Sequence, residues 1–330
     1  MGRPGAWAGP HSPGRTGAPG PPRGPAAPEP RARPGAWACP TARPAPGAPL
    51  DETSRARALL AAQPVVEGHT ELPASLDPED LPPVRAAEAG AQFWGLHAGP
   101  GEDPASVVGT LRRIDAVRAL VAGCPEHLRL AQTTSEMAHA RNCGRVAALL
   151  GPVGWTALGA SAATLRAYHA LGVRAVNLTL FDRFARAAVR EMNRIGLAVD
   201  LSGADEDTVR RALETTRAPA LLTRAAPADL SDDVLGLLGG NGAVCMVTVT
   251  DDPAAAADLL DRVRERAGAH CAGISHTTAP AVGYVPLFAE LLRRGWSAQD
   301  LVGLAHGNVT RALRETEFLA RTNRIRPVAA

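Results

Sequence analysis

Two side chains that could do chemistry lie in the stretch VVEGHTELP, between Val65 and Pro73. His69 offers an imidazole nitrogen and Glu71 a carboxylate oxygen, and zinc accepts both kinds of ligand. The stretch follows an apolar run that is typical of a strand, in which residues i and i+2 point to the same face. Both side chains can therefore reach one metal ion, and the rest of the chain must supply the other ligands.

The other reactive residue types do not form a second site with such spacing. All 35 basic residues are arginine, which excludes a lysine Schiff base and a carbamylated lysine that bridges two metals. Cys245 and Cys271 lie in apolar runs, where we expect them to be buried and inert. The net charge of +2, without a basic stripe, argues against nucleic acid as a partner. An odd number of cysteines without metal-type spacing is no disulfide framework: Cys39, Cys124, Cys143, Cys245 and Cys271.

The composition divides the chain into three parts. Residues 1–50 are rich in Pro, Gly, Ala and Arg and carry too few large apolar side chains to offset the entropy of ordering. We expect residues 1–50 to be a disordered tail, residues 51–320 a globular domain and residues 321–330 a flexible C-terminus. No run approaches the ~20 apolar residues of a membrane span. Neither a secretory signal nor a lipid-anchor signal is visible.

Within the globular part, short apolar runs alternate with longer segments of helical periodicity. This alternation is typical of a parallel sheet whose faces are covered by helices. The predicted strands are 64–69, 91–96, 145–151, 173–179, 196–202, 219–223, 243–249 and 271–275. The predicted helices are 161–172, 184–196, 205–216, 232–242 and 253–268, and residues 285–321 are expected to add three short helices.

Eight such strands predict an α/β fold, a (β/α)8 TIM-like barrel with extra C-terminal helices. An open doubly wound sheet is the alternative, but no G-x-G-x-x-G follows the first strand. The expected helix ends agree with these boundaries. Gly172 and Gly196 stand where C-cap glycines belong, and Ser202 and Asp205 stand where N-caps belong.

Several of these segments together resemble the membrane (renal-type) dipeptidases, zinc peptidases with a barrel of the metal-dependent hydrolase type. VVEGHTELP is similar to their first-strand motif D-G-H-N-D-L-P, and GAQFWGLHAGP is similar to their second strand. LRAYHALGVRAVNLTL, VREMNRIGLAVDLSGADEDTVRRALETTRAPALL and LFAELLRRGWSAQDLVGLAHGNVTRALRETE match later parts of the family. The similarity runs from Glu52 to Phe318. It implies two zinc ions at the C-terminal ends of the strands, where they activate a water for dipeptide hydrolysis.

The resemblance assigns two residues to the first metal. His69 matches the family's first zinc-binding histidine, and Glu71 stands where the family has Asp. The eighth-strand stretch AGISHTTAP lacks the Asp that the family carries there, although His276 lies close to that position. Glu71 is therefore a legitimate but longer oxygen ligand, and His276 is a further candidate.

The other positions that the family uses have changed their chemistry. Val153 takes the place of the carboxylate that bridges both metals. Leu180, Gly203 and Arg224 take the places of histidines that end the fourth, fifth and sixth strands. Ala228 takes the place of an arginine that holds the substrate carboxylate. These five are the degenerate positions of the site, and none of the family's catalytic residues is intact.

We interpret the chain as a membrane-dipeptidase-like protein that is catalytically impaired or inactive, a pseudoenzyme. An active metallodipeptidase with one altered metal site, formed by His69, Glu71 and His276, is the alternative. A non-catalytic barrel kept for binding or assembly, and a degenerate or wrongly assembled gene copy, also stay open. Arg224 could pair with Glu71 where a metal would sit. The resemblance implies zinc, a dipeptide substrate, a homodimer and a lipid-anchored extracellular protein.

Overall fold

The computed structural model describes residues 51–70, 89–97, 103, 105–250, 252–276 and 283–325. The predicted tail, residues 1–50, and the candidate ligand Glu71 lie outside the described residues. All eight predicted strands are confirmed, each within a few residues of its expected position. They are β1 (Val65–Thr70), β2 (Ala89–Leu96), β4 (Val146–Gly154), β5 (Ala175–Asn177), β6 (Ala198–Asp200), β7 (Leu221–Ala225), β8 (Val244–Thr248) and β9 (Ala272–Ser275).

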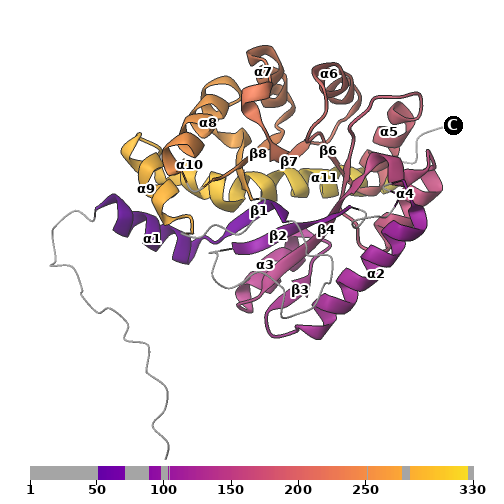
Figure 1. Ribbon diagram of the computed structural model, residues 1–330, viewed down its shortest axis with the longest axis horizontal. Helices are drawn as coiled ribbons and strands as arrows, with labels where there is room; N and C mark the ends of the chain where they lie inside the picture. Colours follow the sequence, from indigo (N-terminus) through magenta and orange to yellow (C-terminus); the bar gives the residue numbers. More distant parts are fainter. Residues whose placement is uncertain are drawn as a thin grey trace, which may run out of the picture. The chain divides into compact units, whose positions relative to one another are not determined.

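These eight strands close into a parallel barrel, as predicted. Their order is β2-β1-β9-β8-β7-β6-β5-β4, and pairing between β4 and β2 completes the ring (Figure 1). A further strand, β3 (Leu128–Leu130), pairs with the first half of β4 and was not predicted. Its three residues are too few to show the alternation by which a strand is recognised in a sequence.

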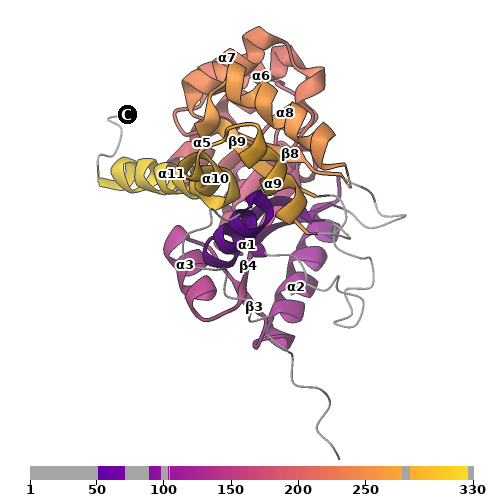
Figure 2. The same cartoon turned by 90° about the vertical axis from the view of Figure 1, so that its left-hand side faces the viewer.

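Helices surround the ring, and every helix predicted from the sequence is confirmed (Figures 1 and 2). The C-terminal segment folds into three helices as expected, although the last of them is long rather than short. The helices are α1 (Glu52–Ala62), α2 (Val107–Gly123), α3 (Thr134–Asn142), α4 (Ala162–Ala170), α5 (Ala185–Ile195), α6 (Glu206–Thr215), α7 (Asp232–Asn241), α8 (Pro253–Arg266), α9 (Val285–Arg293), α10 (Ala298–Val302) and α11 (Asn308–Ile325).

Three of the four predicted cap residues lie at helix termini, as expected. The Asp205 carboxylate accepts a hydrogen bond from the Thr208 backbone N–H at 2.7 Å and caps α6. Gly196 ends α5 with φ of +88°, and Gly172 follows the last turn of α4 with φ of +109°. The expectation that Ser202 is an N-cap was wrong. Its hydroxyl donates to the buried Asp200 carboxylate on β6 instead, because α6 begins four residues later, at Glu206.

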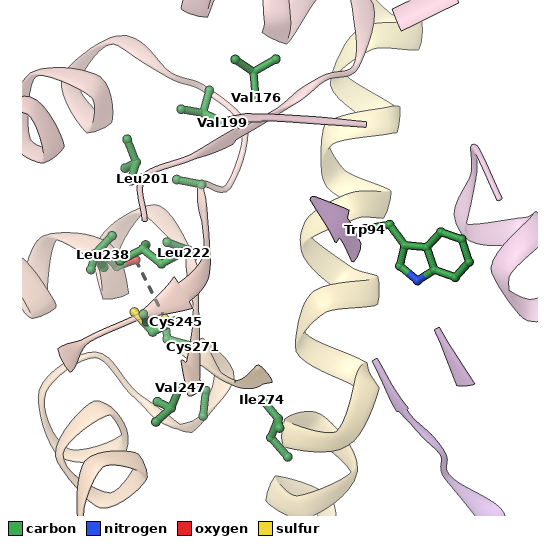
Figure 3. Close-up of a cluster of buried hydrophobic side chains, with 14 of the residues drawn as sticks. Trp94, Val176, Val199, Leu201, Leu222, Leu238, Cys245, Val247, Cys271 and Ile274 are labelled. Carbon is green, nitrogen blue, oxygen red and sulfur yellow. Dashed lines mark hydrogen bonds between the residues drawn. The ribbon is translucent and has the colours of Figure 1, made fainter. Parts of the chain in front are cut away.

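The larger hydrophobic core fills the space between the ring and its helices. Outward-facing side chains of the strands, such as Val199, Leu222 and Val247, pack there with Leu238 of α7 and other helix residues (Figure 3). Cys245 and Cys271 lie in this core and are fully buried, as predicted. Burial raises the pKa of both thiols, which keeps them protonated and unreactive at neutral pH.

A smaller core fills the inside of the ring, and α11 closes one end of it. Inward-facing Leu149 and Met246 pack in one cluster with Val309, Ala312 and Leu313 of α11. Figure 1 shows α11 crossing behind the strands. The helix continues beyond residue 320 to Ile325. Of the helices that the structure describes, none is both long enough and apolar enough to cross a membrane.

Candidate active site

An irregularity in β1 turns His69 toward the inside of the barrel. Glu67 lies opposite Gln92 of β2, whereas Thr70 lies opposite Trp94, so three steps along β1 match two along β2. Such a bulge re-aims the side chains that follow it, because one residue is added to the two-residue alternation. Glu67 and His69 therefore face different surroundings although they are two residues apart.

His69 lies at the C-terminal end of the ring, which we call the barrel mouth. We use this name for the region around five described polar residues: His69, His97, Asn177, Asp200 and Arg224. The imidazole rings of His69 and His97 are 5.6 Å apart between centroids. Gly95 leaves room for them, because a Cβ there would lie 2.5 Å from Cε1 of His69. Burial, with smaller contributions from His97 and the Arg224 cation, lowers the pKa of His69 to about 4. His69 is therefore a neutral imidazole at neutral pH.

This low pKa predicts a pH-dependent contribution of His69 to stability. In the unfolded chain His69 binds a proton below its ordinary pKa of 6.5, whereas in the folded chain it stays neutral down to about 4. Its contribution is therefore complete above 6.5 and is lost as the pH falls from 6.5 toward 4. The unfolding free energy of the wild type should fall between pH 7 and pH 5. In His69→Gln we expect this fall to be smaller by roughly 2 kcal/mol.

Urea unfolding of the wild type and the variant at both pH values measures this difference. His127→Gln provides a control that makes the same exchange of side chains at an exposed position. An equal decrease in the wild type and in His69→Gln would show that His69 titrates alike in the folded and unfolded chains.

A second bulge aims Arg224 toward the mouth. Leu222 lies opposite Cys245 and Ala225 lies opposite Val247, so three steps along β7 again match two along the neighbouring strand. Leu222 and Ala225 both pack in the outer core. The side chain of Arg224 is exposed, and its charge acts on His69. A permanent cation therefore stands close to His69, the candidate ligand on β1.

Asp200 holds the ends of β5, β6 and β7 together beneath the mouth. Its carboxylate is fully buried and accepts hydrogen bonds from Asn177 Nδ2 at 2.9 Å, Ser202 Oγ at 2.7 Å and the Thr223 backbone N–H at 2.7 Å. Ser202 Oγ in turn accepts from the backbone N–H of Arg224 at 2.9 Å. Burial raises the pKa of Asp200. This network fixes the backbone of β7 at the point from which Arg224 extends.

A pocket of about 210 Å³ opens beside this network, at the ends of β2, β4 and β5. His97, Trp155 and Asn177 are among its lining residues. The indole N–H of Trp155 donates to Asp182 at 3.2 Å, which holds the ring at the rim. The pocket therefore offers a polar amide, an imidazole and an aromatic surface to a small ligand.

The degenerate positions lie in different surroundings. Val153 is fully buried and packs in the outer core rather than facing the mouth. Leu180 is 56% exposed just beyond the end of β5, and Gly203 has a left-handed φ of +71°. Ala228 is exposed in the short 3-10 turn Pro227–Asp229. Arg224, the charged member of the five, contributes to the lowered pKa of His69.

A buried carboxyl that the sequence analysis did not single out lies on β1. Glu67 accepts hydrogen bonds from the Tyr284 hydroxyl at 2.5 Å and from Gln92 Nε2 at 2.6 Å, and burial raises its pKa. The candidate ligand His276 is also buried, with its ring 5.0 Å from that of Tyr284. The signal for this cluster was the presence of Glu and Gln inside the two apolar runs that form β1 and β2.

The described residues do not fit a two-metal centre. His69 has the neutral form that metals bind, but the neighbouring Arg224 repels a cation. Within the described ranges, no three His, Cys, Asp or Glu side chains are grouped so that they could hold a metal ion. The expected ion pair between Arg224 and Glu71 falls outside the described residues, because Glu71 does.

The sequence also matches known proteins over most of its length. The family model of the membrane dipeptidases (peptidase family M19) matches residues 53–185 and 181–326. The chain belongs to this family. Dipeptidase 3 of Macaca fascicularis is 28% identical over 343 residues, which cover 83% of this chain and 70% of that protein. Dipeptidase aclJ of Aspergillus oryzae is 30% identical over 299 residues, which cover 74% of this chain and 71% of that protein.

Solved structures of two peptidases share the fold of the chain. The probable dipeptidase PvdM of Pseudomonas aeruginosa superimposes with a TM-score of 0.73 at 15% identity, covering 82% of this chain and 99% of PvdM. A metallo peptidase of Rhodobacter sphaeroides, solved with a phosphinate mimic of L-Ala-D-Ala, gives a TM-score of 0.67 at 16% identity. Coverage there is 77% of this chain and 99% of the peptidase. Membership of the membrane dipeptidase family implies a metal cofactor.

Proposed function

We propose that this membrane dipeptidase family member binds dipeptides at the barrel mouth but hydrolyses them poorly or not at all. The observation that carries the proposal is the placement of Arg224. Its guanidinium is always charged, and it stands at a position where the resemblance expects a histidine that binds the second zinc. Two metals that share a bridging water need several anionic or neutral ligands, and a cation among them opposes both ions.

The same cation is suited to binding the substrate. A dipeptide ends in a carboxylate, and guanidinium and carboxylate groups form short, charge-assisted hydrogen bonds. The pocket beside Asn177 and Trp155, at the same end of the barrel, has room for a small ligand. The metallo peptidase of Rhodobacter sphaeroides carries a dipeptide mimic, which supports the ligand class for this family member. Homodimerisation, which the resemblance implies, stays a prediction.

Metal analysis and a dipeptidase assay test the proposal directly. The protein is incubated with zinc and dialysed extensively, and its zinc content is measured by elemental mass spectrometry. We expect less than one zinc ion per chain. We expect kcat/KM for L-Ala-D-Ala to be at least ~10³-fold below that of a two-zinc family member assayed in parallel, because several kcal/mol of metal-based stabilisation would be lost. Calorimetric titration with L-Ala-D-Ala should still show saturable binding.

Two variants complete this experiment. Arg224→Gln should weaken dipeptide binding, while Arg186→Gln, on the outer helix α5, should leave it unchanged. Two bound zinc ions with rapid hydrolysis would overturn the proposal. One bound zinc and hydrolysis that both disappear in His69→Ala would instead support the alternative, an active dipeptidase with a single altered metal site.

A further inference from the structure

A second pocket opens at the end of the barrel opposite the mouth. It has a volume of about 150 Å³ and lies where β1 and β2 begin, between α3 and the start of α11. In Figure 2 α3 lies below α11, and these two helices are in contact. Met137 and Ala91 form apolar parts of the lining, whereas Arg141, Arg314 and His306 supply polar groups. None of these residues belongs to the mouth.

The two arginines of this pocket differ from their neighbours in their pairing. On α11, Arg311 and Arg321 each form an ion pair with a glutamate four residues away on the same helix. In the part of the chain that the structure describes, neither Arg141 nor Arg314 has a carboxylate within ion-pair distance. Two guanidinium groups from different helices thus line one small concavity, and neither has a direct ion-pair partner among the described residues. The carboxylate of Glu317 is bound by Thr134 of the lining.

His306, a third polar residue of this pocket, lies close to the Arg141 cation. It lies in the π-helical turn Gly303–Gly307 that joins α10 to α11, a type of turn often found at functional sites. Its Nε2 lies 2.7 Å from Oε1 of Gln63, which fixes the ring. Burial and the Arg141 cation lower the pKa of His306. The Arg141 cation is therefore close enough to the imidazole to oppose its protonation.

We propose that this pocket binds a small oxyanion, a phosphate or carboxylate group, between Arg141 and Arg314. Planar guanidinium forks from two sides match the oxygens of such a group and can hold it by several charge-assisted hydrogen bonds. The volume exceeds by about tenfold the ~10–15 Å³ that one water requires, which is enough for such a group. The hydroxyl of Thr310, which also lines the pocket, provides a further donor.

Titration of the full chain with inorganic phosphate, and separately with acetate, tests this site. Calorimetry and the NMR signal of the His306 ring both report on binding. We expect one saturable binding event per chain. Arg141→Gln together with Arg314→Gln should raise Kd at least about tenfold. Arg186→Gln, an exposed arginine on α5, should leave Kd unchanged. Tighter binding of phosphate than of acetate would identify a phosphate group as the ligand, and the reverse would identify a carboxylate.

The design also separates this site from the mouth. Arg224→Gln should leave the phosphate titration unchanged if the anion binds at the opposite end of the barrel. Absence of saturable binding to the wild type would overturn the proposal. So would binding that survives the double substitution, or binding that is lost with Arg224→Gln while the His306 signal does not move. Because the readout is anion binding and not hydrolysis, these outcomes are independent of the proposed function.

Discussion

Gly68→Ala should lower the free energy of unfolding by about 3 kcal/mol, because the barrel interior has no space for one more carbon. A Cβ at this position would lie 2.2 Å from the carbonyl oxygen of Thr223 and 2.8 Å from Cβ of Met246. The first of these atoms belongs to the backbone of β7, so it can move only if the strand moves. Urea unfolding at neutral pH, followed by circular dichroism, gives the difference from the wild type.

Gly236 provides the matched control for this substitution. It lies in the helix α7, where an added Cβ would meet nothing within 4 Å. Gly236→Ala should therefore stabilise the protein by about 0.5–1 kcal/mol, since alanine loses less backbone entropy in a helix than glycine does. If Gly68→Ala were as stable as the wild type, the close approach of β1 and β7 inside the barrel would be contradicted. The bulge that aims His69 would then need another explanation.

Asp200→Ala should have an effect of similar size, about 3 kcal/mol of destabilisation. Its buried carboxylate accepts hydrogen bonds from Asn177, Ser202 and the backbone N–H of Thr223. Removing the acceptor leaves these donors unsatisfied in an interior site, and each unsatisfied donor costs about 1–3 kcal/mol. Burial of the Asp200 carboxylate raises its pKa and is itself unfavourable. Removing this cost offsets part of the destabilisation caused by the unsatisfied donors. Urea unfolding measures the total.

Amide hydrogen exchange at Thr223 adds a local readout of the same substitution. We expect exchange at this position to become faster in Asp200→Ala, because its backbone N–H loses its acceptor. Asp229→Ala, at an exposed position in the 3-10 turn, should change the unfolding free energy by less than about 0.5 kcal/mol. Unchanged stability and unchanged exchange in Asp200→Ala would mean that the three strand ends are held together by other contacts.

The arrangement of strands and helices could be predicted because its signal is local. Each strand of the ring is buried on both faces, so it appears in the sequence as a short apolar run, and each covering helix shows an apolar stripe of helical period. Asp205 and Gly196 mark helix ends through side-chain or backbone properties of single residues. The strand β3 carries only the three residues LRL, and its pairing with β4 leaves no such pattern.

The candidate site could be predicted only in part. His69 and Arg224 were found through their positions in strands and through the resemblance to a family. The surroundings of Ser202 were not foreseen, because its role depends on Asp200, which lies two residues away and inside the ring. The buried partners of Glu67 include Tyr284, more than two hundred residues further along the chain, and no local pattern connects them.

The sequence by itself determined the barrel, the family and the residue types at the ends of its strands. The tertiary structure alone decided which of those side chains face one another. One added residue in β1 and one in β7 reverse the alternation of inward and outward side chains, and the strand patterns do not reveal where such bulges occur. Through them Arg224 lies close enough to His69 to help lower the pKa of that imidazole, while Val153 packs in the outer core.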